Sequence, residues 1–339
     1  MPQPLKPGLA AEHVMHPLDR AGLQAVVDKA AGVLGRGVFE RLMRDAEEDF
    51  YLLNLADNTR LGPTQGASVY NLVADVAHTL GLPVPNVFLD TSPGFKPRTL
   101  GGANPCLVLP SALIDVLPDA ALRAAVGHEL GYIVCGHSFY RLLAENFTRL
   151  SQLAGVIPWV GPILSAGLQL VLLDWYRKAA LSADRVALLG TQDPEAIQHY
   201  LMWSAGASTR IGGELSAEGL ALQAAELRDA QARKRTGGMI DRLGYALSEV
   251  MLQQVWNHNP WPAVRLGEIT IWADSKEYRR LLAGEYAEVL AEKAPAEPLA
   301  GEGPGLLDRA ASFGKYAGGK IGGLFGKGGP PTGKGEPGA

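Results

Sequence analysis

The stretch AAVGHELGYIVCGH, residues 124–137, decides the fold, because it sets His128 and Glu129 side by side within a run of small and apolar residues. Such a surrounding is typical of a helix buried in a core. With Pro118-Asp119 as a helix start, the pattern predicts one long helix from Pro118 to about Leu150. We therefore expect His128 and Glu129 to lie inside the protein.

This helix carries part of a metal-binding pattern. In H-E-x-x-H, two histidines at i and i+4 lie on one helical face and bind one zinc ion, while the glutamate acts as a base on the metal-bound water. His128 and Glu129 are present here, but the i+4 residue is Tyr132. A tyrosine hydroxyl has a pKa of about 10, so its phenolate is an uncommon zinc ligand.

The segment resembles the active-site helix of the zinc metallopeptidases that include the CAAX prenyl proteases and the heat-shock membrane proteases, a gluzincin family. The segment WYRKAALSADR, residues 175–185, resembles the second metal-binding helix of that family, which reads E-x-x-A-D. In the family, the glutamate is the third zinc ligand and the aspartate holds the histidines. Ala183 and Asp184 match this motif, whereas the ligand position is Ala180.

Two further segments resemble the same family. The sequence LVLPS, beginning at Leu107, is similar to its edge strand, and Asn259 and Arg265 fall on its H-P…R motif, with asparagine in place of histidine. The resemblance implies that Leu107, Val108, Asn259 and Arg265 bind substrate. It also implies an α+β, mostly α fold: a gluzincin-like domain with a small β-sheet and a long active-site helix.

The departures fall on positions that would carry the chemistry. A catalytic zinc site uses three protein ligands, and only His128 remains of the set that the resemblance implies. We therefore expect no zinc cofactor and an inactive homologue, a pseudopeptidase, that binds a peptide or protein. The alternative is a zinc endopeptidase with unusual ligands, for which Cys135 and His137 would have to rebuild the site.

Without a metal, the retained polar residues need other partners, because buried carboxylates are costly when unpaired. One interpretation is a structural cluster of His128, Glu129, Tyr132 and Asp184, with His128 donating to Asp184. The other is a water-filled remnant of a cleft. In either case we expect Glu129 to face the cleft, as the resemblance implies, so that its loss costs less stability than the loss of Asp184.

The chain divides by composition into three parts: an N-terminal helical region at 1–66, the metallopeptidase-like domain at 67–293, and a glycine- and proline-rich tail at 294–339. Residues 153–173 contain no charged side chain. One membrane crossing there would separate the two site helices, so a buried hairpin or an interfacial element is expected. Residues 306–327 keep apolar residues at roughly helical spacing between lysines, which leaves a peripheral membrane or assembly contact open.

The overall composition narrows the class of protein further. Of 339 residues, 31 are basic and 35 are acidic, giving a net charge of −4, which argues against a nucleic-acid-binding role. An apolar content of 47% is enough for a large core. The two cysteines, Cys106 and Cys135, are too few for a disulfide framework. With no secretory signal pattern at the start, we expect a cytoplasmic location.

Overall fold

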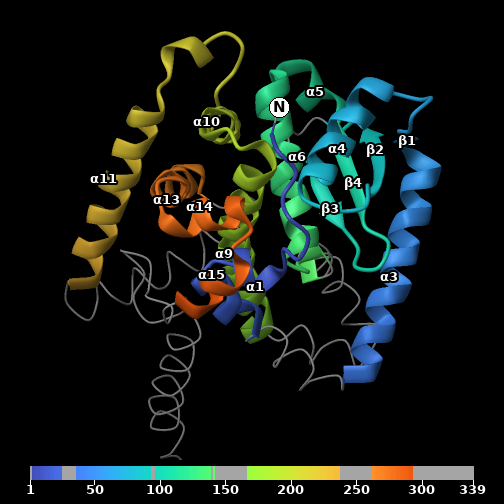
Figure 1. The fold of residues 1–339 in the computed structure, drawn as a ribbon, viewed down its shortest axis with the longest axis horizontal. Coiled ribbons are helices and arrows are strands. Elements are labelled where there is room, and N and C mark those ends of the chain that lie inside the picture. Colours follow the sequence, from blue (N-terminus) through green and yellow to red (C-terminus); the bar gives the residue numbers. More distant parts are fainter. Residues whose placement is uncertain are drawn as a thin grey trace, which may run out of the picture.

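The computed structural model describes residues 2–24, 36–92, 96–138, 140–141, 166–236 and 261–292. Two helices, α6 (Asp119–Val134) and α9 (Ala166–Thr191), form its centre, and the other elements surround them (Figure 1). The fold is mostly helical with one small sheet, as the sequence predicted. Further helices are α1 (Ala11–Val14), α3 (Arg36–Asp57), α4 (Ala67–Thr79), α5 (Ser111–Val116), α10 (Pro194–Ser204), α11 (Ala217–Thr236), α13 (Pro262–Ala273), α14 (Lys276–Ala283) and α15 (Tyr286–Glu292).

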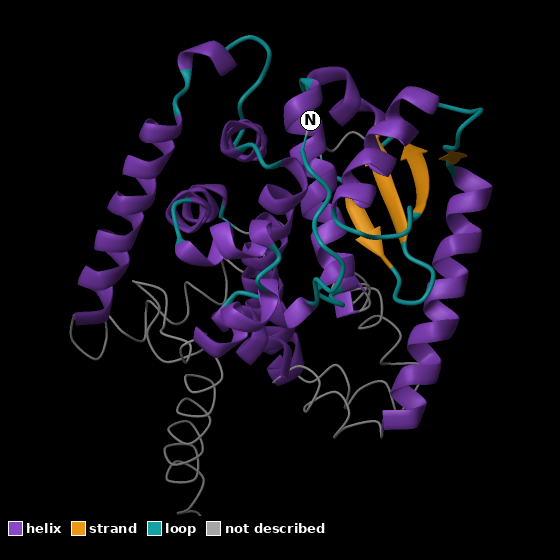
Figure 2. Cartoon of the chain, viewed as in Figure 1, coloured by secondary structure: helices purple, strands orange, loops and turns teal. Residues whose placement is uncertain are grey.

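The sheet has four strands in the order β1-β2-β4-β3 and lies to one side of the central helices (Figure 2). Strand β2 (Asn86–Asp90) runs parallel to β4 (Cys106–Pro110), whereas β1 (Thr59–Arg60) and β3 (Arg98–Leu100) are antiparallel to their neighbours. The apolar run of β4 was recognised from the sequence, as part of the LVLPS segment. The two short outer strands were missed, because neither contains a run of apolar residues.

Strand β4 corrects one expectation from the sequence. Leu107 and Val108 were expected on an edge strand, but β4 pairs with β2 on one side and with β3 on the other. Both side chains are fully buried. The edge position on this side of the sheet belongs to β3, a strand of three residues.

Helix α6 is shorter than the sequence suggested, since it ends at Val134 and does not continue toward Leu150. Gly136 has φ +67°, a left-handed conformation that glycine adopts without strain. The backbone N–H of Gly136 donates to Ile133 and that of His137 donates to Tyr132, which is the Schellman arrangement of a helix C-terminus. The turn redirects the chain immediately after the His128-Glu129 face.

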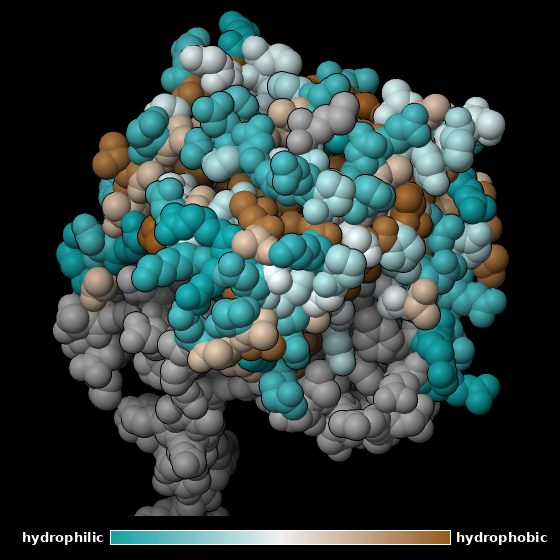
Figure 3. Space-filling view, viewed as in Figure 1, coloured by the Kyte–Doolittle hydropathy of each residue, from teal (hydrophilic) through white to brown (hydrophobic). Residues whose placement is uncertain are grey.

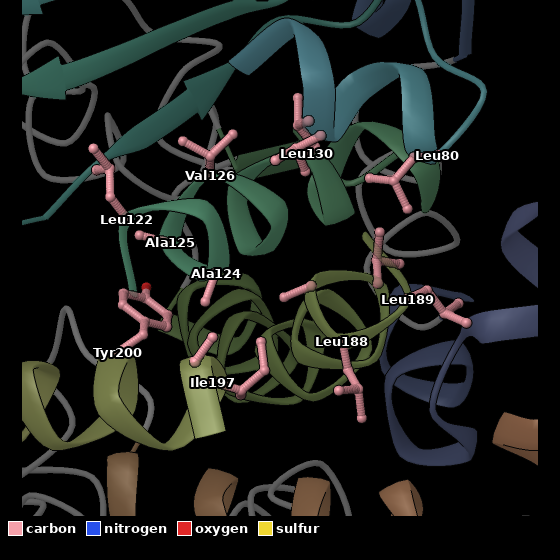
Figure 4. Close-up of a cluster of buried hydrophobic side chains, with 14 of the residues drawn as sticks. Leu80, Leu122, Ala124, Ala125, Val126, Leu130, Leu188, Leu189, Ile197 and Tyr200 are labelled. Carbon is pink, nitrogen blue, oxygen red and sulfur yellow. The ribbon is translucent and has the colours of Figure 1, made fainter. Parts of the chain in front are cut away.

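The core lies between α6 and α9 and extends to α4 and α10. Apolar residues from these four helices pack together in Figure 4, and Tyr200 of α10 lies at the margin of the group. Leu5 and Val14 from the N-terminal segment belong to the same buried cluster. The N-terminal segment therefore shares its core with the rest of the described chain. The domain boundaries proposed at residues 66 and 293 stay predictions.

The surface in the view of Figure 3 is mostly polar, with hydrophobic residues in small patches. No helix within the described ranges combines the length and the apolar character that a bilayer crossing requires. Of the charge-free segment 153–173, residues 153–165 lie outside the described residues, and the remainder begins α9. The tail from residue 293 onward, including 306–327, also lies outside them.

Candidate functional site

The His128-Glu129 pair lies on the buried side of α6, as the sequence predicted. His128 is 4% exposed and Glu129 is 2% exposed. Glycine makes the close approach of α9 possible: a Cβ atom on Gly131 would lie 2.7 Å from the Cα of Ala183. The two helices therefore pack nearly backbone to backbone, and the side chains beside this contact lose their access to water.

Asp184 reaches His128 from α9, so the two helices meet as expected. The Nδ1 atom of His128 lies 2.8 Å from Oδ1 of Asp184. This short distance favours the tautomer in which Nδ1–H donates to the carboxylate. Ala180, one turn earlier on α9, contributes only a buried methyl group at the position where a metal-binding glutamate would stand.

Arg265 on α13 is the main partner of Asp184. Its Nε donates to Oδ2 of Asp184 at 2.7 Å and its Nη2 donates to Oδ1 at 2.6 Å, so the contact is bidentate. Nη2 also approaches Nδ1 of His128 at 3.1 Å. Arg265 is 2% exposed. The substrate-binding role expected for this residue is therefore not supported by its position, because its guanidinium group faces the buried carboxylate.

Burial and the arginine charge set the protonation states of this trio. Desolvation, together with the charge of Arg265, lowers the pKa of His128 to about 4, against the opposing effect of Asp184. Burial alone would raise the pKa of Asp184, but the charge and hydrogen bonds of Arg265 bring it below its usual value. At neutral pH the site therefore holds a neutral imidazole, a carboxylate and a guanidinium ion.

Glu129, the residue after His128 on α6, belongs to a second ion pair. Its Oε2 atom accepts a hydrogen bond of 2.6 Å from Nη1 of Arg141. The Cζ atom of Arg141 lies 4.3 Å from the centre of the Tyr132 ring. The expectation that Glu129 faces an open cleft is therefore wrong, because Arg141, a residue that no motif highlighted, closes over it.

The described donors do not suit zinc. His128 is the one imidazole of the implied ligand set, Ala180 has no donor atom, and burial raises the pKa of Tyr132 well above its usual value. The cationic Nη2 of Arg265 also lies 3.5 Å from Nε2 of His128, where a metal ion would meet repulsion. Within the described ranges, no group of three or more potential ligands gathers around a common point.

A separate polar cluster lies beside this site and was also missed by the sequence analysis. Asp19 is fully buried and accepts hydrogen bonds from Trp175 (3.0 Å) and from Ser182, which in turn accepts one from the backbone of His16. His137 lies 3.2 Å from Asp19 without hydrogen-bond geometry at either ring nitrogen. Burial raises the pKa of Asp19 to about 7 and lowers that of His137 to about 3.

The other predicted site residues are distributed as follows. Leu107 and Val108 pair with Thr99 and Arg98 of β3, so they lie one strand inward from the edge of the sheet. Asn259 lies outside the described residues. Cys135 caps α6 and is buried, and His137 belongs to the Asp19 cluster, so neither joins His128 in a common ligand set.

The long helix with its His-Glu pair, packed against a helix whose aspartate holds the histidine, resembles the paired site helices of the zinc metallopeptidase class. Residues 73–209 match the model of peptidase family M48. The chain is 29% identical over 278 residues to the plastoglobule-localized metallopeptidase 48, chloroplastic, of Arabidopsis thaliana, an alignment that covers 81% of this chain and 76% of the relative. No solved structure matches the chain. The family resemblance of the sequence is thus confirmed.

Proposed function

We propose that the protein is a catalytically inactive member of the M48 family that binds a peptide or protein partner. The observation that carries this proposal is the ion pair between Glu129 and Arg141, at 2.6 Å, in a position that is almost fully buried. A general base must reach the water or proton on which it acts. Glu129 instead neutralises an arginine, and Arg265 neutralises Asp184 in the same way.

A peptide partner would bind by adding a strand to the sheet at β3. In the described sheet, β3 has a paired neighbour on one side, β4, and its other side is the outer edge of the sheet. An extended peptide can pair with the backbone of such an edge without any metal ion. Leu107 and Val108 lie opposite Thr99 and Arg98 and would hold β3 in place from the neighbouring strand β4. Asn259 would contribute a further contact to the peptide.

Metal content and peptidase activity test the proposal together. We expect purified protein dialysed against a mild chelator to retain far less than one zinc ion per chain, and to leave unfolded casein intact with or without added zinc. The alternative, an active zinc endopeptidase, is favoured by the name of the Arabidopsis relative, a metallopeptidase, and by the retained His128-Glu129 pair. Stoichiometric zinc, together with casein cleavage that Glu129→Gln abolishes, would establish that alternative instead.

For location, we propose a cytoplasmic protein with peripheral contact to a membrane or an assembly through segments 153–173 and 306–327. The name of the relative places that protein at plastoglobules, which supports a surface-associated role here. Flotation with liposomes, comparing the full chain with a chain ending at residue 293, tests this proposal. Equal recovery of both chains in the unbound fraction would contradict it. We propose no nucleic-acid partner, in line with the net charge of −4.

A further inference from the structure

The side chain of Arg141 fills a cage built by three other segments. Glu129 and Tyr132 come from α6, Tyr176 comes from α9, and the carbonyl group of Pro97 comes from the segment that leads into β3. The guanidinium group donates to Oε2 of Glu129 at 2.6 Å and to the Pro97 oxygen at 3.5 Å. Its Cζ atom lies 4.3 Å from the ring centre of Tyr132 and 5.6 Å from that of Tyr176.

These four groups match the chemistry of a guanidinium ion in particular. A carboxylate accepts charge-assisted hydrogen bonds from the planar N–H groups, and aromatic faces attract a delocalised cation that is weakly hydrated. The carbonyl oxygen accepts from a second nitrogen of the same plane. A lysine ammonium is a compact and strongly hydrated charge, so it would use the carboxylate while interacting less favourably with the two aromatic rings.

The cage and its occupant belong to different parts of the chain. Glu129, Tyr132 and Tyr176 are fixed on the closely packed α6–α9 pair, whereas Arg141 follows the turn at Gly136 that ends α6. The walls therefore do not depend on Arg141 for their backbone positions. We propose that the cage is a binding site for guanidinium groups, that Arg141 is its internal occupant, and that an arginine side chain of a bound peptide competes with Arg141 for it.

The part of this inference that concerns peptides rests on the proposed function. Arg141 touches both Glu129 and the carbonyl of Pro97, the residue next to the edge strand β3. A peptide paired with β3 would thus pass beside the cage. The intrinsic guanidinium site, in contrast, can be tested without any peptide, so the two proposals are separable.

The first experiment removes the occupant and supplies a substitute. Arg141→Ala should melt at a lower temperature than the parent, and millimolar methylguanidinium should raise that temperature by several degrees, with the logarithmic concentration dependence of mass action. Methylammonium should have a much smaller effect, and the parent should not respond. If Arg141→Ala is unfolded alone, the measurement becomes the recovery of its circular dichroism and melting transition by methylguanidinium but not by methylammonium.

Two control variants make this experiment specific. Arg123→Ala removes an arginine from a solvent-exposed pair with Asp75 and should show no rescue by methylguanidinium. Arg141→Ala combined with Glu129→Gln should lose the rescue, because the charged acceptor is gone. Equal effects of methylguanidinium and methylammonium on Arg141→Ala, or no effect of either, would overturn the cage.

The second experiment addresses the partner. By fluorescence anisotropy, Arg141→Ala should bind an extended arginine-containing peptide at least about tenfold more tightly than the parent does, because the internal competitor is removed. The same peptide with citrulline in place of arginine should bind both proteins equally weakly. If methylguanidinium rescues the variant but neither protein prefers arginine to citrulline, the cage stands and its use by a peptide partner is wrong.

Discussion

The guanidinium group of Arg265 holds the carboxylate of Asp184 through two hydrogen bonds, of 2.7 Å and 2.6 Å, and both side chains are 2% exposed. Asp184 would hold a metal-binding histidine in the family that the sequence resembles, and here an arginine supplies the positive charge beside that histidine. The pair thereby stabilises a carboxylate that burial would otherwise drive to its protonated form. Asp184 and Arg265 therefore stabilise each other as a buried ion pair in the core.

Breaking this pair should be costly, whereas replacing both partners should cost less. Asp184→Ala leaves a buried guanidinium group without its main partner, which typically costs about 3–5 kcal/mol. At about 2–4 °C per kcal/mol, its melting temperature should fall by roughly 10 °C. The double variant Asp184→Leu, Arg265→Met should lose less than Asp184→Ala does. Melting curves of the three proteins test this, with Asp75→Ala, in an exposed pair, changing stability by about 1 kcal/mol at most.

Glu129 should contribute to stability in a similar way, contrary to what an open cleft would imply. Glu129→Ala removes the carboxylate that pairs with the buried guanidinium of Arg141 at 2.6 Å, so we expect a loss of about 3 kcal/mol. Glu129→Gln keeps an acceptor oxygen and should lose less. Chemical denaturation is the measurement, and Glu48→Ala on the exposed side of α3 should stay within about 0.5 kcal/mol of the parent. A Glu129→Ala variant as stable as Glu48→Ala would show that the ion pair is not formed in solution.

The sequence allowed part of this site to be predicted. The proximity of His128 and Asp184 could be predicted from their motifs. In the family that the sequence resembles, these two motifs lie on helices that pack against each other. The roles of Arg141 and Asp19 could not be predicted, since both act through tertiary contacts that leave no local pattern in the sequence. The edge strand was misplaced because β3 is three residues long, and the end of α6 depends on Gly136, whose left-handed conformation competes with an otherwise continuous helical pattern.

The close contact of α6 and α9 should depend on Gly131. In Gly131→Ala, the new Cβ would lie 2.7 Å from the Cα and 2.9 Å from the carbonyl oxygen of Ala183, so the backbones must separate. We expect a loss of several kcal/mol, beyond the usual range for overpacking of about 1–3 kcal/mol. Gly267→Ala on α13 is the matched control, because nothing lies within 4 Å of its added Cβ and alanine favours a helix by up to about 1 kcal/mol. Comparable melting temperatures of the two variants would contradict the tight packing.

Restoring the missing ligands should restore zinc binding. Tyr132→His together with Ala180→Glu would return the imidazole and carboxylate that the family pattern places beside His128. Zinc should then raise the melting temperature of the double variant, because a ligand that binds only the folded state stabilises it, whereas the parent should be unaffected. Isothermal titration with zinc checks the stoichiometry. If the double variant folds but binds no more zinc than the parent, the nearby Arg265 charge dominates, and adding Arg265→Met should then recover the binding.

The buried acid Asp19 should make stability depend on pH in a defined direction. The pKa of Asp19 is raised to about 7, because the effect of burial outweighs the lowering by the hydrogen bonds from Ser182 and Trp175 and by the charge of Arg185. The folded protein therefore holds this proton between about pH 4 and pH 7, whereas the unfolded chain releases it, so this group's contribution to stability falls as the pH rises through that window.

The variant Asp19→Asn tests this, because an asparagine side chain resembles the protonated acid and does not titrate. Relative to the parent, Asp19→Asn should therefore gain about 2–4 kcal/mol between pH 5 and pH 8, measured by urea denaturation at both values. The neighbouring His137, whose pKa is lowered to about 3, stays neutral in both proteins over this range and cancels in the difference. A stability difference that is constant with pH, or that shifts in favour of the parent, would instead mean that Asp19 is ionised and paired with a protonated His137.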